Sequence, residues 1–287
     1  MRFFQTQMSC WPAVRLPHAW RVLGCLAGLT GLLAGLLGGC TTGSSPEATA
    51  RTYESARISI PRVAVDGTEV VAGYHGRVRD DPAQAQLRAL AARGLRMPTV
   101  LYLHGCTGLG FAALVDLAQI AEAGAIAYAP DSYARPGRPA ACDETRHTHG
   151  GLGMWLLRFE EAAHARDRLA AEPWIDDTRV VLMGFSEGGF AVALSRDPRY
   201  VGYVVSGANC VGYNNQNGLV VPPHKPVLVI LSRFDPWFST PEACTASLAG
   251  RPNSRSVILD KPGHHMNGEP EAREALRGFL GTTLKLK

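Results

Sequence analysis

Short apolar runs alternate with helix-like segments through most of this chain. Runs of this kind are typical of strands buried on both faces; they occur at Thr99–His104, Ala125–Ala129, Arg179–Met183, Val201–Ser206, Pro226–Leu231 and Ser256–Leu259. Helical spacing is found at Asp81–Leu95, Leu109–Glu122, Trp155–Ala171, Glu187–Ser195 and Glu269–Leu284. Strands that alternate with helices join through parallel crossovers. The sequence therefore predicts an α/β fold with a mostly parallel central sheet flanked by helices.

An antiparallel hairpin is predicted ahead of this pattern, from Arg57–Val65 and Glu69–Val78 around the Asp66-Gly67 turn. No Pro- or Gly-rich break divides the chain after residue 55. With 287 residues, 46% of them hydrophobic, the chain is long enough for one large domain with its own core.

Charge argues against a nucleic-acid partner. The net charge is +4, and without the three arginines of residues 1–39 the chain has 26 basic and 25 acidic residues. Binding to nucleic acid needs a basic patch, and this balance offers none.

The first 39 residues have the pattern of an export signal. Arg15 and Arg21 precede an apolar, Leu- and Gly-rich run that ends in Leu37-Gly38-Gly39-Cys40. This ending resembles a bacterial lipobox, which implies cleavage before Cys40 and its lipidation. The same run is also near the minimum length of a transmembrane anchor, so an uncleaved anchor is the alternative.

We therefore predict a signal peptide over residues 1–39, a tether over 40–55 and one folded domain over 56–287. The lipid anchor would hold the protein on a membrane. Thr41 after the cysteine resembles the sorting signal of outer-membrane lipoproteins, so in a Gram-negative cell we expect the periplasmic side of the outer membrane.

Disulfides persist in exported proteins. The predicted domain holds Cys106, Cys142, Cys210 and Cys244, which allow three pairings. We favour Cys106–Cys142 and Cys210–Cys244, because each pair should lie in neighbouring loops of the predicted fold. None of the four has CxxC spacing, and His147 and His149 lack further ligands, so we predict no metal site.

The segment Gly184-Phe185-Ser186-Glu187-Gly188-Gly189 follows an apolar strand and opens a helix. This is the context that the G-x-S-x-G nucleophile motif requires, with glycines where a sharp turn leaves no room for side chains. The motif predicts Ser186 as a nucleophile; a glycine-rich surface turn is the alternative.

A serine nucleophile needs a histidine base and an acid that orients it. In this topology the chain order is the serine first, then the acid, then the histidine. Asp235 comes just after one predicted strand, and His264 and His265 come just after the next. The carboxyl ends of parallel strands share one edge of a sheet, so these groups are expected to meet there. Asp131, after an earlier strand, is an alternative acid.

Two backbone N–H groups should form the oxyanion hole. One is expected from Glu187, directly after the nucleophile, and one from Cys106 in the His104–Gly108 loop, with Thr107 as second choice. Cys106 as a nucleophile is a weaker alternative. Tyr133, His147 and Trp237 are candidates for lining a substrate pocket.

Together these residues resemble the α/β-hydrolase superfamily and, within it, the dienelactone hydrolase family. The matching segments are Leu101–Leu109, Ala129–Tyr133, the Gly184–Gly189 turn, Asp235 and Pro262–His265. The resemblance implies hydrolysis of esters or lactones by a nucleophile–His–Asp triad without metal or cofactor. Dienelactone hydrolases proper have Cys at the nucleophile position, so Ser186 favours a serine esterase. The spacing in that family favours His265 as the base; many other α/β-hydrolases favour the position of His264.

The sequence thus predicts an exported serine hydrolase that acts on a small-molecule carboxylic ester. A peptidase or an acyltransferase with the same triad is one alternative. The other is an inactive envelope lipoprotein of this fold that serves as a binding module.

Overall fold

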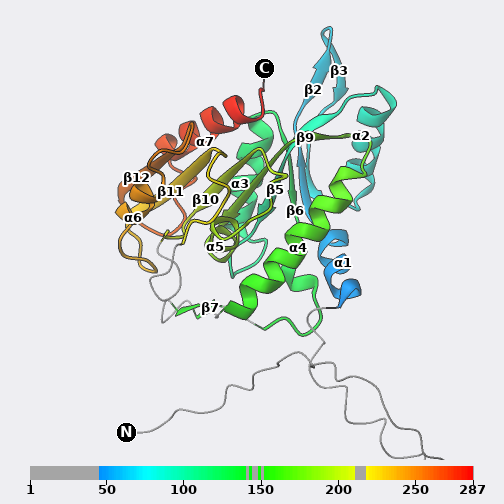
Figure 1. Cartoon of the computed structure of the whole chain (residues 1–287). Helices are drawn as coiled ribbons and strands as arrows, with labels where there is room; N and C mark the ends of the chain where they lie inside the picture. The colour runs from blue at the N-terminus through cyan, green and yellow to red at the C-terminus, as the bar shows by residue number, and fades with distance from the viewer. Residues whose placement is uncertain (1–44, 140–141, 144–147, 150–151, 211–217, 287) are drawn as a thin grey trace, which may run out of the picture. The chain divides into compact units, whose positions relative to one another are not determined.

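The computed structural model describes residues 45–139, 142–143, 148–149, 152–210 and 218–286. Its main sheet contains eight strands, β1 (Arg57–Ile60), β4 (Tyr74–Arg77), β5 (Met97–Leu103), β6 (Ile126–Ala129), β9 (Ile175–Phe185), β10 (Gly202–Ser206), β11 (Val227–Phe234) and β12 (Arg255–Pro262). They lie in the order β12-β11-β10-β9-β5-β6-β1-β4 (Figure 1). The six neighbours from β12 to β6 are all parallel, and β1 pairs antiparallel with both β6 and β4. This confirms the predicted fold class.

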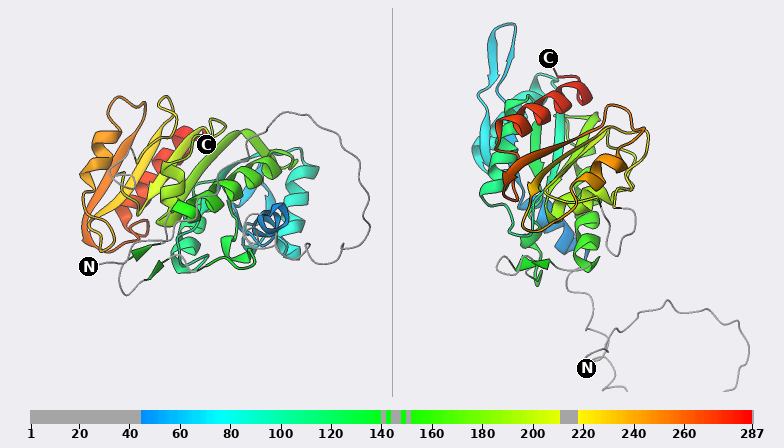
Figure 2. Two further views of the ribbon diagram at one scale, coloured as in Figure 1. Left: turned by 60° about the horizontal axis from the view of Figure 1, so that its bottom comes forward. Right: turned by 90° about the vertical axis from the view of Figure 1, so that its left-hand side faces the viewer.

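Helices cover both faces of the sheet (Figure 2). The buried side chains of α3 (Phe111–Glu122) and α7 (Pro270–Thr283) join one apolar cluster with one face of the strands. The opposite face packs against α1 (Pro46–Glu54), α2 (Asp81–Ala92), α4 (Leu152–Ala170), α5 (Glu187–Ala193) and α6 (Glu242–Ser247). The central strands are apolar on both sides because each side is covered, as their continuous apolar runs predicted.

The strand order reverses next to β5. The chain goes from β5 through α3 to β6 on one side, then through α4 to β9 on the other side. The loops after β5 and β9 therefore diverge from two adjacent strands, and such a switch point leaves a crevice at the carboxyl edge of the sheet. Cys106 and Ser186 follow β5 and β9, and Asp235 and His264 follow β11 and β12 at the same edge of the sheet.

The predicted hairpin is present as β2 (Val63–Val65) and β3 (Thr68–Val71), which project beyond the main sheet in Figure 1. Asp66 and Gly67 both have positive φ, at 51° and 77°, as a tight two-residue turn requires. The flanking strands β1 and β4 pair with each other, so the two halves of the hairpin extend into the main sheet.

The predicted tether is too long. Residues 46–54 form α1, which begins with the Ser45 side chain accepting a hydrogen bond from the backbone N–H of Ala48. Tyr53 is buried and stacks on Tyr128 of β6 at 4.8 Å. The folded part therefore starts about ten residues earlier than expected, since α1 buries one face against the sheet and α4.

Both predicted disulfides are present, Cys106–Cys142 and Cys210–Cys244. Cys142 belongs to β7 (Cys142–Asp143), which pairs with β8 (Thr148–His149). The predicted signal peptide and the lipidation site Cys40 lie outside the described residues. Within the described residues, every helix is too short or too polar to span a bilayer.

Candidate active site

Ser186 lies at the sharp turn from β9 into α5, with φ 54° and ψ −116°. An L-residue rarely adopts this conformation, and the surroundings hold it in place. A Cβ on Gly184 would lie 2.3 Å from the carbonyl oxygen of Gly188, and a Cβ on Gly188 would lie 2.0 Å from that of Leu103. The backbone N–H of Ser186 donates to the carbonyl of Ser206 at 2.8 Å. The glycines are therefore required by backbone contacts, as the motif predicted.

His264 connects Ser186 to Asp235. Its Nε2 lies 2.8 Å from Ser186 Oγ, and its Nδ1 lies 2.8 Å from Asp235 Oδ2. The Asp235 side chain is 1% exposed, and its other oxygen accepts the backbone N–H of Trp237 at 2.8 Å. With Nδ1–H donating to the carboxylate, Nε2 is free to take a proton from the serine, which is the arrangement that general-base catalysis needs.

Aromatic side chains fix the plane of this imidazole. The Trp237 ring stacks on His264 at 5.6 Å, and Phe238 and Phe185 contact it at 5.7 Å and 4.9 Å. Rings on several sides restrict rotation of the histidine, so its two hydrogen bonds keep their direction. Trp237, predicted to line a pocket, therefore also supports the base.

The sequence-based preference for His265 is corrected by this geometry. His265 Nε2 lies 2.9 Å from Asp116 of α3, and its ring contacts Phe185 edge-to-face. β12 runs on to Pro262, and Gly263 follows with φ 139°. The next two side chains diverge from there, so only His264 reaches Ser186.

The loop after β5 approaches the serine. An added Cβ on Gly105 would lie 3.3 Å from the Cβ of Ser186. Cys106, the next residue, is buried and joined to Cys142, and its carbonyl accepts a hydrogen bond from the hydroxyl of Tyr133. Glu187, directly after Ser186, begins α5. The two segments predicted to supply oxyanion N–H groups thus both adjoin the nucleophile, and Cys106 is a cystine residue rather than a free thiol.

The side chain of Glu187 has a place that the sequence did not suggest. It is buried, 2.5 Å from Arg138 Nη2 and 3.8 Å from Arg158 Nε. Burial raises the pKa of Glu187 above its ordinary value, and the two guanidinium groups oppose that shift. The residue after the nucleophile therefore fastens α5 to α4 and to the segment after η1 (Ser132–Ala134).

A second buried carboxylate extends this charged cluster. Glu161 receives Arg135 Nε at 2.8 Å, Arg158 Nη1 at 2.9 Å and the hydroxyl of Ser132 at 2.7 Å. Both side chains of the Arg158–Glu161 pair are fully buried, one turn apart on α4. This pair was not singled out from the sequence; its signal there is the i, i+3 spacing of opposite charges.

His104 holds the loop after β5 in place through two hydrogen bonds. Its Nδ1 is 2.6 Å from the carbonyl of Gly105, and its Nε2 accepts the backbone N–H of Ser132 at 3.0 Å. Burial, and then the charge of Arg158, hold the pKa of His104 well below its ordinary value. A neutral ring with Nδ1–H satisfies both contacts, so His104 links the loops after β5 and β6.

Asp131 and Tyr133 make contacts other than the hydrogen bonds of the triad. Asp131, the alternative acid, caps η1 by accepting the backbone N–H of Tyr133 at 3.0 Å. Tyr133 is 38% exposed, with the Arg138 guanidinium 4.1 Å above its ring. His147 lies outside the described residues. Over the part of the chain that is described, no three His, Cys, Asp or Glu side chains gather as a metal site would need.

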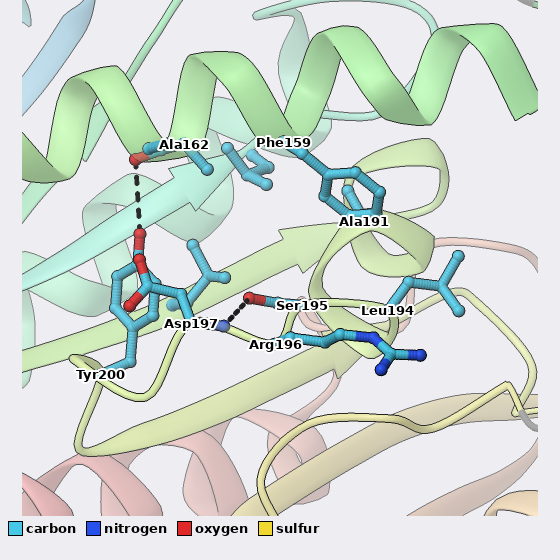
Figure 3. Close-up of a pocket in the computed structure, with 11 residues that line it drawn as sticks. Phe159, Ala162, Ala191, Leu194, Ser195, Arg196, Asp197 and Tyr200 are labelled. Atoms are coloured by element: carbon cyan, nitrogen blue, oxygen red, sulfur yellow. Dashed lines mark hydrogen bonds between the residues drawn. The ribbon is translucent and has the colours of Figure 1, made fainter.

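A separate cavity of about 320 Å³ lies between α4 and α5 (Figure 3). Phe159 and Ala162 of α4 face Ala191 and Leu194 across it, and the Tyr200 hydroxyl donates to the carbonyl of Ala162 at 3.4 Å. None of Ser186, Asp235 and His264 lines this cavity. It is a gap behind the nucleophile helix and not the site of the triad.

Comparison with known proteins agrees with this description. The profile of the dienelactone hydrolase family matches residues 85–247, more than half of the chain; the match includes Ser186 and Asp235 and ends before His264. No curated protein matches significantly.

Two similar solved structures illustrate the fold. A protein described as a dienelactone hydrolase from Klebsiella pneumoniae is 17% identical with a TM-score of 0.51, and the alignment covers 80% of this chain and 98% of that one. An esterase from the archaeon Pyrobaculum calidifontis is 16% identical with a TM-score of 0.48, over 83% of this chain and 89% of that one.

Proposed function

This chain belongs to the dienelactone hydrolase family, and on that premise we propose that it hydrolyses carboxylic esters with Ser186 as the nucleophile. The observation that carries the proposal is the pair of 2.8 Å contacts that join His264 to Ser186 and to Asp235. A binding module would not need a nucleophile, base and acid aligned in this way.

The reaction follows from the atoms that lie together. Ser186 Oγ attacks the ester carbonyl carbon as its proton passes to His264 Nε2, and Asp235 stabilises the imidazolium that forms. The N–H groups of Cys106 and Glu187 hold the negative oxygen of the tetrahedral intermediate. His264 then returns the proton to the leaving alcohol, which leaves an acyl-serine. Water attacks that ester as His264 takes its proton, and His264 then gives the proton to Ser186 Oγ as the bond to the acyl carbon breaks, which releases the acid and the free serine.

The decisive experiment is intact-mass spectrometry after exposure to a fluorophosphonate probe. We expect one adduct on the wild type and none on Ser186→Ala. Ser195→Ala is a matched control, since Ser195 is also buried but lines the cavity between α4 and α5. No adduct on a folded wild type would favour a binding module instead.

Turnover assays then distinguish an ester hydrolase from a peptidase or an acyltransferase with the same triad. Short acyl esters should be hydrolysed faster than the matching amides, and added alcohols should not divert the acyl group. Preferred cleavage of amides would support a peptidase, and transfer to alcohols would support an acyltransferase. Ser186→Ala should abolish all three reactions.

We propose further that the protein is exported and held at the cell envelope by a lipid on Cys40. Two disulfides support an oxidising compartment. Labelling of cells with palmitate should mark the wild type and not Cys40→Ala; labelling that persists in that variant would refute the anchor.

A further inference from the structure

Asp116 is the acidic residue on the buried, mostly apolar face of α3. It lies on α3 and is fully buried, between Ala113 and Leu117 of the apolar cluster. Three donors surround its carboxylate: the Tyr102 hydroxyl at 2.7 Å, Asn267 Nδ2 at 2.8 Å and His265 Nε2 at 2.9 Å. A buried carboxylate is costly unless it is fully hydrogen-bonded, and this one is.

Two of these donors belong to the loop that carries the base. His265 follows His264 directly, and Asn267 comes two residues later. The backbone carbonyl of Asn267 is also held from α3, by Gln119 Nε2 at 2.8 Å. Helix α3 thus holds the His264 loop through three hydrogen bonds, made by Asp116 and Gln119.

The same network reaches the nucleophile. Asn267 Oδ1 accepts the Ser206 hydroxyl at 2.7 Å, and the Ser206 carbonyl accepts the backbone N–H of Ser186 at 2.8 Å. Both groups of Ser206 are buried at the end of β10. One residue therefore links the turn of the nucleophile to the loop of the base.

Phe185 keeps the two histidines apart. Its ring contacts His264 at 4.9 Å and His265 edge-to-face at 4.8 Å. The two imidazoles both pack against this ring and bind different acids, Asp235 and Asp116.

We propose that Asp116 is a positioning residue for the base, acting through His265 and Asn267. It holds the loop after β12 so that His264 Nε2 stays within hydrogen-bond distance of Ser186 Oγ. This inference rests on the proposed function, because a base needs positioning only if it acts. Apolar side chains would fill the same space at less desolvation cost, so stability alone does not account for the network.

The kinetic test compares His265→Ala with His265→Gln, whose side-chain amide can again donate to Asp116. We expect His265→Ala to lower kcat roughly 10- to 100-fold, as small misplacements of catalytic groups do, with KM within about threefold. His265→Gln should recover most of that loss. In Asp116→Asn an amide NH₂ replaces one carboxylate oxygen and faces groups that themselves donate, so this variant should resemble His265→Ala. Leu117→Ala, on the same helix but outside the network, should lower the Tm with kcat unchanged.

A second readout does not depend on turnover. In the full-length protein without substrate, NMR of ¹⁵N-labelled histidine should show a low-field Nδ1 proton for His264 hydrogen-bonded to Asp235. We expect this signal to be lost or broadened in His265→Ala and Asp116→Asn, and to return in His265→Gln.

The two readouts separate the two ideas. If kcat and the signal persist in His265→Ala while the Tm falls as in Leu117→Ala, Asp116 has only a structural role and the inference is wrong. If the wild type shows the signal but hydrolyses no ester, the proposed function fails, and the spectra of the variants alone decide whether Asp116 positions His264.

Discussion

Removal of the Cys106–Cys142 disulfide should lower turnover far more than removal of Cys210–Cys244, although the two losses of stability should be nearly equal. The perturbation is a pair of double variants, Cys106→Ser with Cys142→Ser, and Cys210→Ser with Cys244→Ser. Serine keeps the backbone N–H at position 106 and leaves no free thiol behind.

The equal stability follows from the lengths of the closed loops. The paired cysteines are separated by 36 and 34 residues. The chain-entropy relation gives about 4 kcal/mol for each crosslink, with a difference of less than about 0.1 kcal/mol.

The unequal turnover follows from what each disulfide holds. Cys106 adjoins Gly105, which approaches Ser186, and carries one predicted oxyanion N–H. Full loss of such a donor costs about 10²–10³ in kcat. The hydrogen bond from Tyr133 to the Cys106 carbonyl remains, so we expect a partial loss of about 10- to 100-fold. Cys210 and Cys244 are both buried in the apolar cluster on the face of the sheet that α4 and α5 cover, and neither carries a predicted oxyanion N–H, so we expect less than about a threefold change there.

The assay is ester hydrolysis at saturating substrate, normalised to the fraction of molecules that a fluorophosphonate labels, with urea unfolding in parallel. Normalisation removes any misfolded fraction from kcat. If both double variants keep wild-type kcat, or lose it equally, the disulfide does not hold the oxyanion loop and the reasoning is refuted.

Three further substitutions test the framework of the site. Gly188→Ala should prevent folding, since its Cβ would lie 2.0 Å from a backbone oxygen of β5, whereas Gly278→Ala, with open space on α7, should fold; circular dichroism distinguishes them. The pKa of His104 in the folded protein is well below its value in the unfolded chain, about 6.5, so the unfolded state takes up the proton first. The free energy of unfolding should therefore fall as the pH drops below 6.5, by up to about 1.4 kcal/mol per pH unit. Urea unfolding of His104→Gln from pH 8 to pH 5 should show a smaller acid slope, and an unchanged slope would contradict this. Glu187→Ala removes the carboxylate that lies 2.5 Å from the buried Arg138 guanidinium and should cost about 3–5 kcal/mol, against at most about 1 kcal/mol for Glu69→Ala at an exposed pair. Equal losses of unfolding free energy would count against the buried cluster.

The strands and the nucleophile turn were predictable because their signals are local. Continuous apolar runs and a glycine frame around Ser186 are both dictated by short-range geometry, and the structure has them where the sequence indicates. The disulfide pairs followed from the fold, since each joins the segments that follow two parallel strands: β5 and β6 for Cys106–Cys142, and β10 and β11 for Cys210–Cys244.

The choice between His264 and His265 was beyond local pattern. Both follow the same strand, and each has its own acid. What separates them is the direction of the loop after Gly263 and the presence of Asp116 on α3, which is distant in sequence. A lone Asp within an apolar helix was the available sign of that partner.

Two other features were missed for different reasons. Helix α1 has the start signal Ser45-Pro46-Glu47, but its polar composition resembled a tether, and only packing against β6 and α4 makes it part of the domain. The buried charges of Arg158, Glu161 and Glu187 have partners on three segments of the chain, so no single segment of the sequence predicts the cluster.

The turn at Ser186 does not depend on which atom the side chain presents as the nucleophile. The contacts that enforce the turn are made by main-chain atoms of Gly184, Gly188 and Leu103, and none involves the serine side chain. Exchange of oxygen for sulfur at this position would therefore leave the scaffold unchanged and alter only nucleophilicity and proton affinity. Ser186→Cys would turn the site into a chemical gauge, because the rate at which its thiol is alkylated reports the electrostatic potential that the surrounding groups impose on that single atom.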